Sequence, residues 1–253
     1  MRLFPWLAAL LLCSCVADVP QRVSTAPPPA IRPAPPATPA PPTLLQQLSD
    51  AAPAADPAVL ALALRARRCA AGAEVGTGST LGVIDYSRPS TQRRLWVFDM
   101  AAPRLLYSEY VAHGRGSGEN LARHFSNDDG SLQSSLGLFR TAETYVGDNG
   151  YSLRLDGLEP GVNDHARDRA LVMHGAWYVD PALAATQGRI GRSLGCPALR
   201  PTVAHALIDS LKQGQLLFAY YPDAQWLQDS RFLHCEPART AAEPRIGFHA
   251  ASR

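Results

Sequence analysis

Three short apolar segments decide the fold: Leu81-Gly-Val-Ile-Asp-Tyr86, Arg94-Leu-Trp-Val-Phe-Asp-Met100 and Leu105-Leu-Tyr-Ser-Glu-Tyr-Val111. They are rich in β-branched and aromatic residues and are separated by turn residues, which is typical of strands. The last two flank Ala101-Ala-Pro103, so we expect them to form a hairpin. The segments therefore predict a sheet that begins near residue 81.

The remaining elements follow from similar signals. Asp56 and Pro57 stand where the N-cap and first residue of a helix belong, and they predict a helix over 58–68. The Gly-, Ser-, Asn- and Asp-rich region 114–164 predicts loops joining short strands. We also expect a buried strand at 170–173, a helix at 202–211 capped by Gly214, and a strand at 215–221. This pattern predicts a mainly β domain of sandwich or barrel type with a few short helices.

The amino-terminal part of the chain has the composition of a targeting signal followed by a linker. Residues 1–15 have a positive start and a short apolar stretch, which predicts a signal peptide. Their end, Leu12-Cys13-Ser14-Cys15, resembles a bacterial lipobox, so we expect lipidation of Cys15; ordinary cleavage a few residues later is the alternative. Pro and Ala dominate 16–57, which predicts an extended linker. The domain is expected over 58–235, with a tail over 236–253.

Composition and charge exclude several classes of protein. The 253 residues are 46% hydrophobic and 18% charged, which is ordinary for a globular domain. The formal net charge of +2 gives no concentrated basic face for nucleic acid. Beyond the amino terminus no apolar run reaches the ~20 residues of a membrane-spanning helix. We therefore expect neither a nucleic-acid binder nor a polytopic membrane protein.

A histidine and a cysteine carry the candidate chemistry. His174 follows an apolar strand, and Cys196 lies in the stretch Ser193-Leu-Gly-Cys-Pro197. A thiol attacks an acyl carbon as the thiolate, so it needs a neighbouring base to take its proton. Gly195 leaves room for backbone N–H groups to converge on an oxyanion. Cysteine-dependent acyl transfer is one interpretation; a small buried cysteine is the other.

Residues 81–221 resemble the catalytic domain of the murein L,D-transpeptidases, the YkuD-like family. The matching stretches occur in family order. They are Val111-Ala-His-Gly-Arg-Gly-Ser-Gly118, Phe125-Ser-Asn127, Ser134-Ser-Leu-Gly137, Tyr151-Ser-Leu-Arg-Leu-Asp-Gly157, Asn163, Ala166, Arg169, His174-Gly-Ala-Trp-Tyr178 and Gly191-Arg-Ser-Leu-Gly-Cys-Pro-Ala198.

The resemblance implies a role for each matching residue. Cys196 corresponds to the nucleophile and His174 to the histidine that activates it. Gly175 stands where the family uses a backbone carbonyl to orient the imidazole. The backbone around Gly195 and Cys196 corresponds to the oxyanion site, and Ser193 to the hydroxyl residue that opens the cysteine motif.

Two departures from the wider family accompany this match. Leu194 stands where the widespread motif has histidine, so any role of that histidine is lost. The spacing between His174 and Cys196 is longer than usual, which implies an inserted turn around 181–189.

Other polar residues are weaker candidates. His113, with Arg115, could contact an anionic stem peptide, or its segment could be a turn built for its glycines. Arg192 and Arg200 flank the cysteine and could bind substrate carboxylates, or they could be solvated. The stretches 127–130 and 148–150 have the spacing of Asx and Gly turns, and no His/Cys cluster has zinc spacing, so we expect no metal and no cofactor.

Cysteine usage agrees with an oxidising compartment. With Cys15 assigned to lipid and Cys196 to catalysis, Cys69 and Cys235 flank the domain and are plausible disulfide partners.

The resemblance implies an enzyme of the cell envelope or periplasm, tethered by lipid and acting on peptidoglycan stem peptides. It would form 3→3 crosslinks through a thioester with loss of D-Ala, and carbapenems would acylate it. Two alternatives stay open: hydrolysis by an L,D-carboxypeptidase or amidase on the same stems, and a non-catalytic wall-binding lipoprotein.

Overall fold

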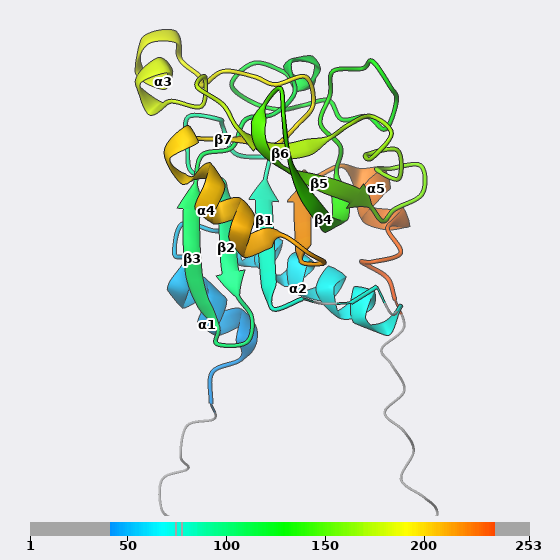
Figure 1. The fold of residues 1–253 in the computed structure, drawn as a ribbon. Coiled ribbons are helices and arrows are strands. Elements are labelled where there is room, and N and C mark those ends of the chain that lie inside the picture. Colours follow the sequence, from blue (N-terminus) through cyan, green and yellow to red (C-terminus); the bar gives the residue numbers. More distant parts are fainter. Residues whose placement is uncertain (1–40, 74, 77, 236–253) are drawn as a thin grey trace, which may run out of the picture. The chain divides into compact units, whose positions relative to one another are not determined.

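The computed structural model describes residues 41–73, 75–76 and 78–235. Their strands form one mixed eight-stranded sheet in the order β3-β2-β1-β8-β4-β5-β6-β7 (Figure 1). The strands are β1 (Thr80–Asp85), β2 (Leu95–Asp99), β3 (Arg104–Glu109), β4 (Gly137–Gly147), β5 (Gly150–Gly157), β6 (Val172–Gly175), β7 (Ala198–Leu199) and β8 (Leu216–Tyr220). The expected mainly β class is confirmed, and the expected hairpin is the antiparallel pair β2–β3.

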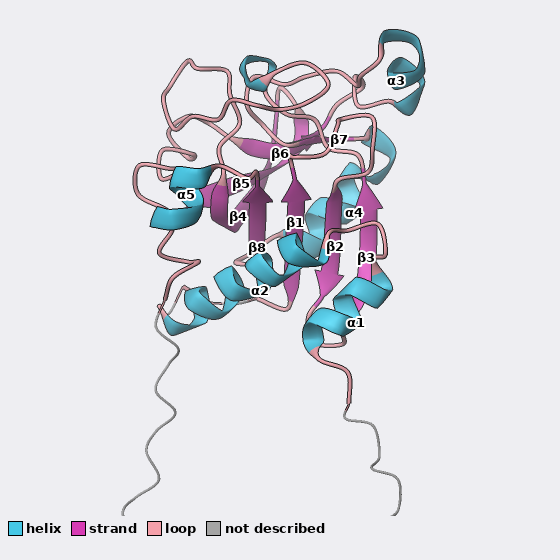
Figure 2. Cartoon of the chain, turned by 180° about the vertical axis from the view of Figure 1, so that it is seen from behind, coloured by secondary structure: helices cyan, strands magenta, loops and turns pink. Residues whose placement is uncertain are grey.

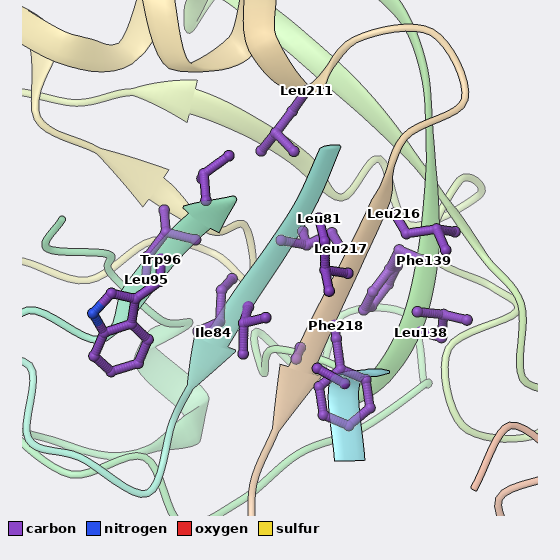
Figure 3. Close-up of a cluster of buried hydrophobic side chains, with 14 of the residues drawn as sticks. Leu81, Ile84, Leu95, Trp96, Leu138, Phe139, Leu211, Leu216, Leu217 and Phe218 are labelled. Carbon is purple, nitrogen blue, oxygen red and sulfur yellow. The ribbon is translucent and has the colours of Figure 1, made fainter. Parts of the chain in front are cut away.

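Helices cover both faces of the first half of the sheet. Figure 2 shows α1 (Leu44–Ala51) and α2 (Pro57–Gly72) on one face, whereas α4 (Pro201–Leu211) lies on the other (Figure 1). All six residues of β1 are buried, as expected for a strand covered on both sides. Figure 3 shows part of the resulting core, in which Leu81, Trp96 and Phe218 are buried together with Leu211 of α4.

The folded region begins earlier than the sequence predicted. Helix α1 lies inside the expected linker and starts with a capping box, in which Thr43 and Gln46 satisfy each other's backbone N–H groups. Leu48 is fully buried in the main core. The prediction of a linker through residue 57 is therefore wrong for residues 44–51, because an amphipathic helix there contributes to the core.

The longest strands lie where loops were expected. β4 and β5 form an antiparallel hairpin within 114–164, joined by the two residues Asp148 and Asn149. β4 also pairs with β8, so the hairpin continues the sheet toward β6 and β7. The prediction that the region contained only short strands is wrong, and this hairpin supports the strand that carries His174.

Two connections differ in detail from expectation. The expected inserted turn contains a helix, α3 (Pro181–Gln187), with Asp180 as its N-cap. Helix α4 ends at a C-cap on Lys212 rather than at Gly214, and the chain then turns through a positive φ at Gln213 and Gly214. A last short helix, α5 (Ala224–Asp229), follows β8.

Candidate active site

Cys196 and His174 are brought together by the pairing of β6 with β7. The two strands run parallel, with His174 opposite Ala198 and Gly175 opposite Leu199. Continuing this register places Cys196 opposite Val172, and the Val172 N–H donates to the Cys196 Sγ at 3.4 Å. The thiol therefore lies against the β6 backbone two residues before the histidine.

The His174 imidazole is oriented by the backbone next to it. Its Nδ1 lies 3.0 Å from the Gly175 carbonyl oxygen, the contact that the resemblance implied. With Nδ1 protonated and donating there, Nε2 is left with a lone pair that can accept a proton. Burial lowers the pKa of His174, and the hydrogen bond to Gly175 opposes this only in part. The imidazole is thus neutral at pH 7, as a general base must be.

The Cys196 thiol is held in its neutral form. Burial raises its pKa, while the Val172 N–H and the positive charge of Arg169 act in the opposite direction. The thiol points to the carbonyl oxygen of Ala170, with 3.8 Å between Sγ and the oxygen. Within the part of the chain that the structure describes, no hydrogen bond joins Sγ to the His174 ring. Proton transfer between the two side chains therefore requires a rearrangement of the site.

The turn that carries the cysteine is built around Gly195. This glycine has φ +134°, and a Cβ at this position would lie 3.0 Å from the Gln133 carbonyl oxygen, so a side chain is excluded. The Ser134 hydroxyl donates to the Gly195 carbonyl at 2.9 Å and accepts from the Gly114 N–H at 3.0 Å. Ser134 thus joins the turn to the 113–118 segment.

One amide of this turn is available for an oxyanion. The Gly195 N–H donates to the Ser193 Oγ at 3.1 Å and is therefore engaged. Among the hydrogen bonds of the described residues, none uses the N–H of Cys196. Of the two predicted contributors to the oxyanion site, the Cys196 amide is the one that donates to no other described residue, although it acts on its own sulfur and lowers the pKa of the thiol.

Ser193 closes the turn on itself. Its hydroxyl donates to the Cys196 carbonyl at 2.6 Å and accepts from Gly195, and the residue is buried. The structure gives Ser193 this structural role rather than the predicted contact with substrate.

The predicted substrate role of His113 is wrong, because its side chain is 0% exposed. The guanidinium of Arg94 donates to Nδ1 of His113 at 2.7 Å, and Nε2 lies 3.3 Å from the Gly118 carbonyl. Burial, and to a smaller extent the positive charge of Arg94, lower the pKa of His113 to about 3. His113 is therefore a neutral core residue that orders the 113–118 segment.

Arg192 and Arg200, predicted to bind substrate, both have protein carboxylates as partners. Arg200 makes a two-pronged ion pair with Glu109, with contacts of 2.7 and 2.9 Å. Arg192 donates to Glu119 at 2.7 Å and to the Gly118 carbonyl at 3.0 Å. Both ion pairs brace the neighbourhood of the cysteine turn, and a role toward substrate stays a prediction.

The remaining sequence predictions concern cysteines, metals and membranes. The structure joins Cys69 to Cys235 by a disulfide, the pairing expected from the sequence. Cys15 lies outside the described residues. Within 41–73, 75–76 and 78–235, no cluster of His, Cys, Asp or Glu could hold a metal ion. No helix in the same ranges is long and apolar enough to cross a membrane.

Sequence reasoning missed the side chains that support the cysteine turn. Ser134 and Arg169 stood only within the stretches that resemble the family, and Arg94 only at the edge of a predicted strand. Their roles depend on contacts between segments far apart in sequence, such as the 61-residue separation between Ser134 and Gly195. Neither periodicity nor spacing predicts such contacts.

Comparison with known proteins assigns the chain to a family. The family model described as "L,D-transpeptidase catalytic domain" matches residues 51–220, more than half of the chain. No curated protein matches the sequence.

Several solved structures are similar at low identity. An L,D-transpeptidase from Mycobacterium smegmatis is 15% identical, with a TM-score of 0.36, over 56% of this chain and 59% of that one. L,D-transpeptidase (Yku) from Stackebrandtia nassauensis is 14% identical, with a TM-score of 0.35, over 63% and 66%. L,D-transpeptidase 3 from Mycobacterium tuberculosis, in complex with a faropenem-derived adduct, is 17% identical, with a TM-score of 0.34, over 56% and 60%.

These matches span less than two thirds of each solved chain, and the family assignment follows from the match over 51–220. The chain belongs to the L,D-transpeptidase catalytic domain family.

Proposed function

We propose that the protein is a cysteine-dependent L,D-transpeptidase that acts on the tetrapeptide stems of peptidoglycan. The observation that supports this most directly is the register of β6 with β7, which sets the Cys196 thiol beside the strand that carries His174. The family to which the chain belongs supplies the reaction class.

In the proposed reaction, Nε2 of His174 takes the thiol proton while the sulfur of Cys196 attacks the carbonyl carbon of the third stem residue, a diamino acid. The amide bond to the terminal D-Ala breaks, and its nitrogen receives the proton from His174 as D-Ala leaves. The side-chain amine of a second stem then attacks the thioester, which releases the thiol and forms a 3→3 crosslink.

The electrostatics of the site favour a general-base route. Burial raises the pKa of Cys196 and lowers that of His174, so both groups are neutral before substrate binds. The thiolate therefore forms only as the site rearranges to let the thiol proton pass to the imidazole. The Cys196 N–H then donates to the oxyanion that develops on the attacked carbonyl.

We also propose that the domain works outside the cytoplasm, in the periplasm or cell envelope. The disulfide between Cys69 and Cys235 supports this, because such bonds persist in oxidising compartments. Anchoring by lipid on Cys15 is part of the same proposal.

The test is mass spectrometry of purified tetrapeptide muropeptides incubated with the protein. We expect a crosslinked dimer that lacks one D-Ala, and we expect Cys196→Ala to abolish it while the melting temperature stays within a few degrees of the native value. A tripeptide monomer in place of the dimer would show hydrolysis. Unchanged muropeptides with the native protein, or continued crosslinking by Cys196→Ala, would overturn the proposal.

A carbapenem gives a second probe of the same sulfur. We expect a mass increase of one drug molecule on the Cys196 peptide of the native protein and none on Cys196→Ala.

A further inference from the structure

Arg169 is a partly buried cation whose hydrogen bonds all go to neutral groups. It lies in the turn before β6, and its two terminal nitrogens reach the same loop. One donates to the Ser126 carbonyl at 2.6 Å and the Ser135 hydroxyl at 2.7 Å. The other donates to the Ser131 hydroxyl at 3.0 Å and the Gln133 carbonyl at 2.8 Å. Among the residues that the structure describes, no carboxylate forms an ion pair with this guanidinium.

The loop that Arg169 holds is the one that packs on the cysteine turn. The Gln133 carbonyl oxygen, which accepts from Arg169, lies 3.0 Å from where a Cβ of Gly195 would be. The neighbouring Ser134 hydroxyl donates to the Gly195 carbonyl. Two consecutive residues of the loop therefore contact the residue before the nucleophile, and Arg169 fixes the first of them.

The backbone next to Arg169 reaches the sulfur from another side. Ala170 has φ 51°, an uncommon conformation for a residue with a side chain, and its carbonyl accepts from the Cys196 thiol. Two residues further on, the Val172 N–H donates to the same sulfur. A single segment, 169–172, thus contacts the sulfur through its backbone and the cysteine turn through the loop that Arg169 binds.

The charge of Arg169 acts on the thiol directly. It lowers the pKa of Cys196 against the larger effect of burial, and the interaction is mutual. The charge of Cys196 also acts on Tyr86 and Tyr178, and burial raises the pKa of both tyrosines to about 12. With His174 neutral, Arg169 is the positive charge that acts on a thiolate at this position.

We propose that Arg169 is a positioning residue for the nucleophile, clamping the loop against the cysteine turn and supplying a positive charge that favours the Cys196 thiolate. This inference rests on the proposed cysteine chemistry. Asp128 and Asp129 are the acidic groups that act on Arg169 from that loop, and both favour its charged form.

The test measures thiolate formation without any wall substrate. The rate of alkylation by iodoacetamide is followed against pH on the full chain, and the Cys196 peptide is quantified by mass spectrometry. Arg169→Met removes the charge and the hydrogen bonds. Arg169→Lys keeps the charge but cannot make the hydrogen bonds of both terminal nitrogens. Arg167→Met is the matched control, because Arg167 lies two residues away and pairs at the surface with Glu143 and Asp156.

We expect the apparent pKa of Cys196 to rise in Arg169→Met, with alkylation at pH 7 slowing about tenfold for each unit of the rise. Arg169→Lys should lie between Arg169→Met and the native protein, and Arg167→Met should match the native protein. The inference is overturned if a folded Arg169→Met keeps the native pH profile, or if Arg167→Met shifts equally.

Should Arg169→Met fail to fold, Arg169→Lys decides alone, and a native alkylation rate in that variant would refute the clamp. Because alkylation needs no muropeptide, failure of the transpeptidase assay and failure of this inference are separate results.

Discussion

The pairing of His113 with Arg94 predicts how the stability of the domain depends on pH. Arg94 is fully buried, and burial lowers its pKa to about 10, so it stays charged at neutral and acidic pH. An arginine can only donate, so Nδ1 of His113 must accept and cannot carry a proton. Protonating this ring in the folded state would place two positive charges in contact.

The size of the effect follows from the two pKa values of His113. The folded value is about 3, and the unfolded value is about 6.5. Above the unfolded value neither state binds a proton, so the contribution is fully present. As the pH falls through the window between the two, only the unfolded chain binds a proton, and the folded state loses stability. The loss is about 2 kcal/mol at pH 5 and about 4 kcal/mol at pH 3.

Urea unfolding at pH 7 and pH 5 measures this loss, and His113→Asn removes the titrating ring while keeping an oxygen that can accept from Arg94. The native protein should lose about 2 kcal/mol more than the variant between the two pH values, because other titrating groups cancel in the comparison. Equal losses in the two proteins, with both unfolding cooperatively, would refute the assignment of His113 as a buried neutral base.

Two further changes test the cysteine turn and the covalent closure of the domain. Gly195→Ala should lower the free energy of unfolding by roughly 1–3 kcal/mol, because it forces a side chain into a positive φ and against the Gln133 carbonyl. It should also abolish crosslinking of muropeptides. Native activity in this variant would contradict the packing described. Replacing Cys69 and Cys235 together by Ala should lower the free energy of unfolding by about 5 kcal/mol, given a separation of 166 residues, and reductant should lower the native protein to the same value.

The fold was only partly predictable from the sequence, and the errors have physical causes. Helix α1 carried a visible signal, since Thr43 and Gln46 have capping-box spacing, but the Pro- and Ala-rich context favoured a linker. The hairpin β4–β5 also had one, because Asn149-Gly150 is a strong turn dipeptide. Its flanking strands are rich in Gly, Thr and charged residues, which weakens the alternation that reveals a strand.

The candidate site was also only partly predictable from the sequence. Cys196 and His174 could be singled out from the sequence because each lies in a short local motif beside a strand, and their catalytic role stays a prediction. His113 was assigned the wrong role because only the tertiary structure shows the guanidinium of Arg94 against its ring. Burial by distant segments decides whether a polar residue meets substrate or the core, and one sequence does not encode that in its local pattern.

The disulfide between Cys69 and Cys235 also determines how the protein bears mechanical load. Residues 69–235 form a covalent ring that contains all eight strands and both candidate catalytic residues. Tension applied to the chain outside this ring would pass along α2 as far as Cys69 and across the sulfur–sulfur bond to Cys235. The strands inside the ring would carry none of this force, so a tethered domain could bear tension without distortion of its candidate active site.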